Sequence, residues 1–489
     1  MGVQTQFTPK RTNLNGLTRT RLHYLRLTRL LRRLPLLFRQ INPQKPFKTL
    51  THLGHPQSVF FSSPTMPSFT SSSSSADPLQ RDFASLLAAA LPFLRDDPDA
   101  VSSDPSLPSL LAALRHAGAG ECWHKHGTFL AHLAGVHRIL TLWNAPQPVA
   151  RCGLYHSAYS NSYVNLAIFP PNSASRAELQ ASLGADAERL VHLFCVIPRQ
   201  PLIHDLLLFR YSDAELADHL AASANPARSG PDEPWRRKLC SLLPPQGIVV
   251  KHIRTGENVP LSRRLAAVFL LMTMADFSDQ LFGFQDRLFE NNDGRMEFTR
   301  SNVAGALWPG DGRPGLWMNS VSRMGAIYRL IAREEEIYLR EKGEEEEQRD
   351  NDIELVIPPV FENCTRVLSP EEQRAARDLY WEAAAGGGGG CGEGGEKAEK
   401  LLRESVERNP FVGEPHVVLA QVYLGMGRWE AAEAAAEKGL RLILEWGSPW
   451  DKRVTWEGWV AWGRVLLMKA REKDWPKSPW GVLNLGLVR

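Results

Sequence analysis

Residues 128–143, TFLAHLAGVHRILTLW, carry the periodicity that decides the fold class. Apolar and aromatic side chains recur here at intervals of three and four residues, which is the spacing of one face of an α-helix. The hydroxyl of Thr128 can cap the first turn, and Pro146 ends the helix because proline cannot continue it. Since His132 shares a face with Phe129, we expect its imidazole to point into the core.

Helical periodicity continues through most of the chain beyond residue 77, and few segments alternate in the manner of a strand. Capping boxes at Ser175–Glu178 and Ser212–Glu215 indicate two more helix starts. Gly184 suits the left-handed position between two helices, whereas residues 244–256 are typical of a loop. We therefore predict an all-α protein.

Composition divides the chain into four parts. Eleven Lys and Arg but no Asp or Glu occur before residue 77, so the net charge of +3 for the whole chain becomes −8 when those eleven are removed. An acidic body of this kind argues against nucleic acid as a partner. We predict a basic leader at 1–76, a helical domain at 77–333, an acidic linker at 334–365, and a second helical domain at 366–489 with a glycine-rich insertion at 386–395.

The leader is rich in Arg, lacks acidic residues and is followed by the serine-rich stretch SFTSSSSSA. This composition is typical of a transit peptide and predicts a plastid or mitochondrial location. The alternative is that translation starts at Met66, in which case we expect a cytoplasmic protein.

Cysteine spacing and hydropathy exclude several classes of protein. The six cysteines contain no CxxC pair, which argues against a thiolate zinc site and against a disulfide scaffold. No run of 18 apolar residues occurs, so we expect no membrane span.

Residues 407–440, ERNPFVGEPHVVLAQVYLGMGRWEAAEAAAEKGL, contain small and large apolar residues in the order of an interlocking helix pair. The residues at these small and large positions are Leu419, Ala420, Tyr423, Gly427, Ala432 and Ala436. This stretch resembles a tetratricopeptide repeat, and the resemblance implies stacked helical hairpins that bind a protein partner.

Two histidines and a later aspartate suggest a metal site in the first domain. His132 and His156 lie on successive predicted helices, and Asp276 lies in the apolar stretch LLMTMADFSDQL. This order resembles the HD-domain metal phosphohydrolases, particularly the hydrolase domain of the guanosine tetraphosphate hydrolase-synthetase family, over residues 120–284. The resemblance implies an HD-like helical bundle in which these three residues hold a divalent transition metal, Mn, Fe or Zn, if the site is intact.

The resemblance also indicates that the site is altered. Ser157 stands where the family has the aspartate of its His-Asp pair, and Ser160 and Asn161 replace two acidic residues of the guanosine tetraphosphate branch. Changes even in outer-shell partners cost about 10- to 100-fold in metal affinity or activity. We therefore expect less than one equivalent of metal.

Other polar residues are candidates for a pocket or ligand-binding role, and each has a structural alternative. The candidates are His124, His126, Ser157, Tyr159, Asn161, Arg199 and Asp279. The histidines can instead hydrogen bond within a turn or the core, and Asp276 and Asp279 can form salt bridges. The literal pair His204-Asp205 is out of family order, and we interpret it as structural.

The segments from GECWHKHGTFLAHL to LVHLFCVIPRQ also resemble a plant family with a domain of unknown function, which implies a plant origin but no activity. Our leading hypothesis is an altered, non-hydrolytic HD-like domain that acts in ligand or protein binding together with the C-terminal helices. One alternative is a metal-dependent phosphohydrolase in which a further histidine such as His124 completes the ligand set. Another is a purely structural adaptor.

Overall fold

The computed structural model describes residues 83–95, 104–124, 127–162, 166–280, 318–342, 353–358, 361, 367–385, 393–448, 450–486 and 488. The predicted leader at 1–76 lies outside these residues, as do His126 and residues 386–392 of the glycine-rich insertion. Residues Ser74–Arg489 belong to one compact unit.

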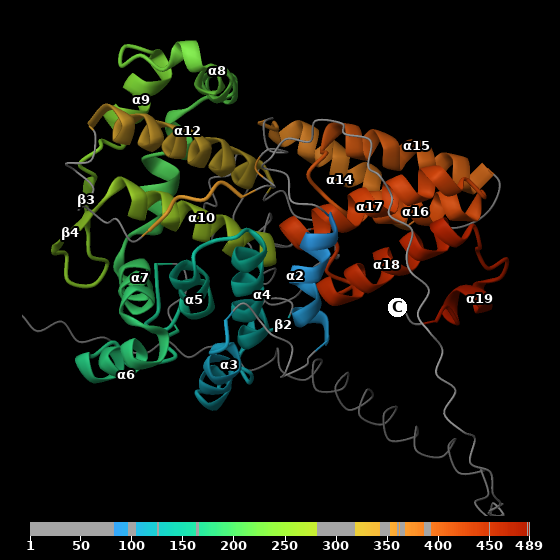
Figure 1. The fold of residues 1–489 in the computed structure, drawn as a ribbon, viewed down its shortest axis with the longest axis horizontal. Helices are drawn as coiled ribbons and strands as arrows, with labels where there is room; N and C mark the ends of the chain where they lie inside the picture. The colour runs from blue at the N-terminus through green and yellow to red at the C-terminus, as the bar shows by residue number, and fades with distance from the viewer. Residues whose placement is uncertain are drawn as a thin grey trace, which may run out of the picture. The chain divides into compact units, whose positions relative to one another are not determined.

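The described chain is mostly helical, as Figure 1 shows. Its first half contains α2 (Phe83–Arg95), α3 (Leu107–His116), α4 (Phe129–Leu142), α5 (Gln147–Tyr155), α6 (Ser173–Leu183), α7 (Ala185–Val196), α8 (Asp213–Ala224), α9 (Pro234–Leu242), α10 (Arg263–Gln280) and α12 (Met318–Lys342). A short π-helix (Gln200–Asp205) and two 3₁₀ turns (Leu208–Arg210 and Pro226–Arg228) complete it. No helix among the described residues has both the length and the apolar character needed to cross a bilayer.

Helix α4 forms as its sequence predicts. Thr128 is the N-cap and its hydroxyl accepts a hydrogen bond from the amide of Ala131. The helix packs against α5 and α10, and α5 packs in turn against α7. His132 is buried, so the prediction that its imidazole points into the core is confirmed.

Two of the predicted helix starts differ in outcome. Ser212 caps α8 by accepting from the amide of Glu215, as predicted. Helix α6, however, begins at Ser173, two residues before the predicted capping box, because Asn172 accepts from the amide of Ser175 and caps the helix instead. Gly184 lies between α6 and α7 as predicted, but its φ of +93° and ψ of 155° are an extended, positive-φ conformation open to glycine, not the predicted left-handed helical one.

Two small antiparallel sheets modify the prediction of an all-α fold. Strands β1 (Trp123–His124) and β2 (Gly127–Thr128) pair just before α4, and β3 (Ile248–Lys251) pairs with β4 (Asn258–Leu261). Strand β3 lies within residues 244–256, which were predicted to be a loop, whereas β4 begins just after them. These strands are only four residues long and alternate between half-buried and exposed side chains, so the period of two is too short to stand out in the sequence.

The C-terminal half consists of successive helices that pack as neighbouring pairs (Figure 1). They are α14 (Pro370–Ala385), α15 (Glu393–Arg408), α16 (Glu414–Gly425), α17 (Trp429–Trp446), α18 (Trp456–Glu472) and the short α19 (Pro479–Leu483). Pairs of this kind are what a helical-hairpin repeat requires. Helix α15 begins inside the predicted insertion, which leaves Glu393–Gly395 in the helix.

The two halves contact each other through α17, which packs against α2 and α4. The indole nitrogen of Trp143 donates to the carbonyl of Glu445, and the rings of Trp143 and Trp446 meet edge to face at 5.5 Å. Helix α12 also runs through the predicted boundary at residue 333. Its Glu334 is buried against Arg236, so this first part of the predicted acidic linker is a packed helix.

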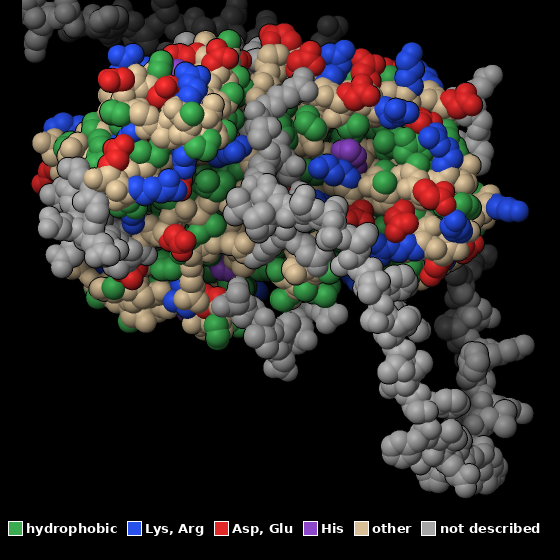
Figure 2. All heavy atoms as spheres, turned by 45° about the horizontal axis from the view of Figure 1, so that its top comes forward, with side chains coloured by type: hydrophobic (Ala, Val, Ile, Leu, Met, Phe, Trp, Pro, Cys, Tyr) green, Lys and Arg blue, Asp and Glu red, His purple; other side chains and the backbone are tan. Residues whose placement is uncertain are grey.

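Acidic and basic side chains are interspersed on the face drawn in Figure 2, including the region of the C-terminal helices. Such mixing is typical of a solvated surface.

Candidate metal centre

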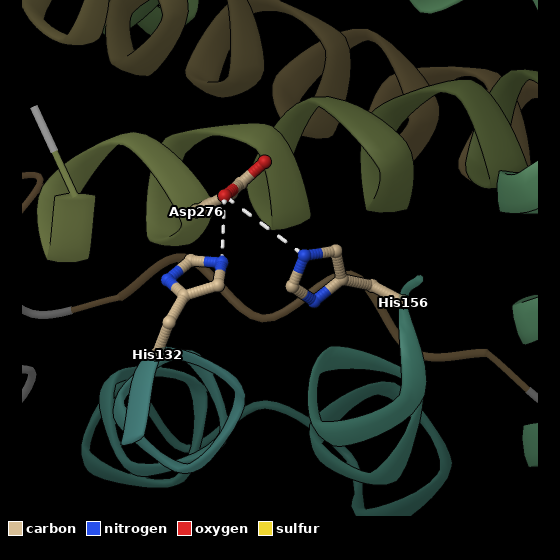
Figure 3. Close-up of side chains that lie close together, drawn as sticks. All are labelled: His132, His156 and Asp276. Carbon is tan, nitrogen blue, oxygen red and sulfur yellow. Dashed lines mark ion pairs between the residues drawn. The ribbon is translucent and has the colours of Figure 1, made fainter. Parts of the chain in front are cut away.

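Three helices bring His132, His156 and Asp276 together (Figure 3). His132 projects from α4, His156 ends α5, and Asp276 projects from α10 toward both rings. The Oδ1 atom of Asp276 lies 3.3 Å from Nε2 of His132 and 3.9 Å from Nε2 of His156. All three side chains are buried. The three residues chosen from the sequence, which span 144 positions from His132 to Asp276, therefore lie together in the fold.

Each of these side chains is oriented by a second contact. The Nδ1 atom of His132 lies 2.8 Å from Oδ2 of Asp279, and Nδ1 of His156 donates to the carbonyl of Gly153 at 2.7 Å. Arg199 donates to Oδ2 of Asp276 at 3.1 Å. As a result, both Nε2 atoms and the remaining Asp276 oxygen are directed at one another. Metal-binding histidines usually have such partners on their second nitrogen.

Two glycines permit this close arrangement. A Cβ atom at Gly135 would lie 2.1 Å from Oδ1 of Asp279, so only glycine leaves room for that carboxylate against α4. A Cβ at Gly153 would lie 2.4 Å from Cδ1 of Leu140, so glycine also lets α5 approach α4 closely. The positions of His132 and His156 relative to each other depend on this approach.

Burial and neighbouring charges set the protonation of the two histidines in opposite directions. Burial disfavours a charged His132, but hydrogen bonds to Asp276 and Asp279 outweigh it and raise the pKa of His132 to about 9. Burial lowers the pKa of His156 to about 4, despite the attraction of Asp276. Burial opposes ionisation of Asp276 as well, yet the His132 hydrogen bond and the charges of His156 and Arg199 hold its pKa well below the usual range. At neutral pH, His156 is therefore a neutral imidazole and Asp276 a carboxylate, so both can bind a metal ion as they are. His132 must first lose a proton.

The donor set fits a divalent transition metal. An ion bound about 2.0–2.2 Å from each ligand atom requires those atoms to lie roughly 3 to 4 Å apart, and the distances to Asp276 of 3.3 and 3.9 Å meet this requirement. All three donor atoms lie within 4.8 Å of one another. Two imidazoles and one carboxylate suit Mn, Fe or Zn. The Nε2 lone pair of His132 accepts either a proton or a metal ion, so the two compete.

Two neutral side chains, Ser157 and Asn161, connect to Arg199 by hydrogen bonds beside His156. Asn161 donates to the hydroxyl of Ser157 at 2.8 Å, and its amide oxygen accepts from Arg199 at 2.9 Å. Arg199 in turn contacts Asp276, and Ser157 is fully buried. Sequence analysis placed Ser157, Asn161 and Arg199 at the pocket, and the structure brings them together beside the two histidines.

Other predicted pocket residues lie around or away from this centre. His124 is half-buried and packs over His132 with a ring separation of 4.7 Å. Tyr159 belongs to another polar group, because its hydroxyl donates to Glu188. His204 is buried beside Phe209 and Phe277. His126 lies outside the described residues.

Sequence reasoning missed Gly135 and Arg138 as parts of this region. Gly135 follows His132 by three residues and so lies on the same helix face, which was the available signal. Arg138 approaches Asp279 to 3.9 Å. Nothing in the local sequence links it to an aspartate on α10.

Comparison with known proteins agrees with part of these expectations. Residues 113–199 match the family model of a domain of unknown function, DUF6817. The matched range contains both histidines and ends at Arg199, whereas Asp276 and Asp279 lie beyond it. No curated protein and no solved structure matches the chain.

Proposed function

We propose that this chain is a metal-dependent binding protein built on an altered HD-like helical domain. His132, His156 and Asp276 form a weak site for one divalent transition-metal ion, and the domain acts in ligand or partner binding together with the C-terminal, tetratricopeptide-like helices. The convergence of two imidazole Nε2 atoms on one Asp276 oxygen, each ligand braced by its own second contact, supports this proposal most directly.

The neutral side chains beside His156 favour binding over hydrolysis. A bound divalent ion lowers the pKa of a coordinated water and gathers phosphate oxygens. Hydrolysis also requires a base positioned for that water. Positions that are acidic in the HD-domain hydrolases carry Ser157, Ser160 and Asn161 here, so none of them can serve as this base. The carboxylate of Asp279 already contacts His132.

The test is metal binding by the full chain and by variants of the altered position. We expect purified protein to retain less than one equivalent of Zn, Mn or Fe, and His156→Ala to retain none. Ser157→Asp restores the missing charge and should raise metal affinity by about 10- to 100-fold. Ser157→Asn, which has a similar size but no charge, is the matched control. Equal affinities in the Asp and Asn variants would contradict the proposed site.

A metal-dependent phosphohydrolase is the second candidate, because three protein ligands leave coordination positions open in the manner of catalytic sites. A full equivalent of metal in the unmodified chain, with hydrolysis of p-nitrophenyl phosphate or guanosine tetraphosphate that His156→Ala abolishes, would establish the enzyme. Metal binding without turnover supports the binding protein.

A further inference from the structure

A cavity of about 190 Å³ lies beside Asp279, on the side where the C-terminal helices meet the first half of the chain. Its walls come from the start and middle of α4, the end of α10, the connection from α17 to α18, and the first turn of α18. Liquid water occupies roughly 30 Å³ per molecule, so the space exceeds the need of a single ordered water. It can hold a small solute.

Hydrogen-bond donors without acceptors line this cavity. Lys452 donates to the carbonyl of Asp279 at 2.8 Å. An ammonium carries three donors, and the other two have no acceptor among the described residues. The Nε atom of Arg138 is buried and has no hydrogen-bond partner in the part of the chain that the structure describes. Burial lowers the pKa of Lys452 although the carboxylates of Asp279, Glu414 and Glu457 favour its charged form.

The first turn of α18 adds donors of the same kind. Thr455 caps this 17-residue helix by accepting from the amide of Gly458. The amides of Trp456 and Glu457 belong to the first turn, where α-helices provide no internal acceptor. The positive end of the helix dipole lies at the same place.

The carboxylates in the cavity wall are already engaged. Asp279 contacts His132 at 2.8 Å and Arg138 at 3.9 Å. Glu457 accepts from Arg138 at 3.2 Å, and with half of its side chain exposed its charge is screened by solvent. Arg138 is paired with both carboxylates and also stacks on the ring of Trp456 at 3.9 Å. The groups that remain for a ligand are therefore the Nε of Arg138, the ammonium of Lys452 and the amides of the first turn of α18.

We propose that this cavity binds a tetrahedral oxyanion of the size of phosphate or sulfate between Lys452, Arg138 and the start of α18. The carboxylate of Glu457 competes with the anion for Arg138, because it already accepts a hydrogen bond from that guanidinium. The site takes its ligand through these groups alone and does not depend on metal at His132 and His156.

The proposal is tested by titration calorimetry of the full chain with inorganic phosphate, after metal removal and dialysis into a chloride-containing HEPES buffer. Lys452→Met should weaken binding about tenfold or more, as expected for the loss of one charge-assisted hydrogen bond. Glu457→Gln should bind about two- to fivefold more tightly, because it removes an exposed ion pair that competes for Arg138. Lys397→Met is the matched control, since that lysine is exposed and pairs with Glu382 elsewhere.

The outcomes separate this site from the metal centre. His156→Ala should leave phosphate affinity unchanged, and sulfate should compete with phosphate whereas chloride should not. Absence of phosphate binding by the unmodified chain, or equal affinities of the Lys452 and Lys397 variants, would overturn the proposal. If Lys452→Met fails to fold by circular dichroism, Glu457→Gln decides: unchanged or weaker binding in that variant contradicts the proposed competition.

Discussion

Replacement of Gly135 by alanine tests whether Asp279 orients His132 in the candidate metal centre. The new Cβ would lie 2.1 Å from Oδ1 and 2.7 Å from Cγ of Asp279. Ordinary van der Waals contact needs more than 3.4 Å, so the carboxylate must move by over 1 Å. Its 2.8 Å contact with His132 is then lost.

The expected magnitude follows from two opposing effects. A hydrogen bond to a charged group contributes about 1.5–3 kcal/mol to stability. Alanine in a helix interior is about 1 kcal/mol more favourable than glycine. We therefore expect Gly135→Ala to lower the free energy of unfolding by about 0.5–2 kcal/mol. We also expect metal affinity to fall by about 10- to 100-fold, because His132 loses the partner that orients it.

Urea unfolding followed by circular dichroism measures the first effect, and competitive zinc titration measures the second. Gly394→Ala is the matched control, because no atom of the described residues lies within 4 Å of its new methyl group. In an Asp279→Ala background there is no carboxylate to displace, so Gly135→Ala should be neutral or stabilising there. An equal loss of stability in both backgrounds would refute the role assigned to Asp279.

Three further predictions concern charge and domain organisation. Burial raises the pKa of Glu414 to about 7, above the ordinary 4.5; its stabilising proton is fully bound below pH 4.5 and is lost as pH rises through 7. The free energy of unfolding should therefore fall by roughly 3 kcal/mol as the pH rises from 4.5 to 9, and Glu414→Gln should not show this fall. Arg199→Met removes one of the two cations that contact the buried Asp276, so the melting temperature should fall by several degrees whether or not metal is present, whereas a Gln variant that keeps a donor to Asp276 should lose less. A fragment that ends at Lys342 loses the α17 contacts of α2 and α4, so it should melt without a cooperative transition, in contrast to the full chain.

Local periodicity and motif order predicted the helices that carry the candidate metal ligands. The α4 helix followed from apolar spacing and a threonine cap, and both features act within a few residues. His132, His156 and Asp276 could be chosen because their order along the chain resembles that of a known family. Their convergence, however, depends on the tertiary packing of α4, α5 and α10.

Features that depend on distant partners could not be predicted. The acidic stretch after Arg333 suggested a solvated linker, yet Glu334 is buried because Arg236 pairs with it at 2.6 Å from 98 positions away. Likewise, a lysine in the connection before α18 gives no local sign that it contacts the end of α10. Strands β3 and β4 were missed for a different reason, because four residues each are too few for a period of two to stand out in the sequence.

Asp279 connects the metal centre to the C-terminal helices through two different groups of one residue. Its carboxylate orients His132, and its main-chain carbonyl accepts from Lys452 of the connection that leads into α18. That connection is itself fixed, because the amides of Trp450 and Asp451 donate to the buried Glu414. A shift of the C-terminal helices would therefore reach the end of α10, and with it Asp279, the partner of the candidate ligand His132. For this reason we regard the C-terminal helices as part of the architecture that positions Asp279.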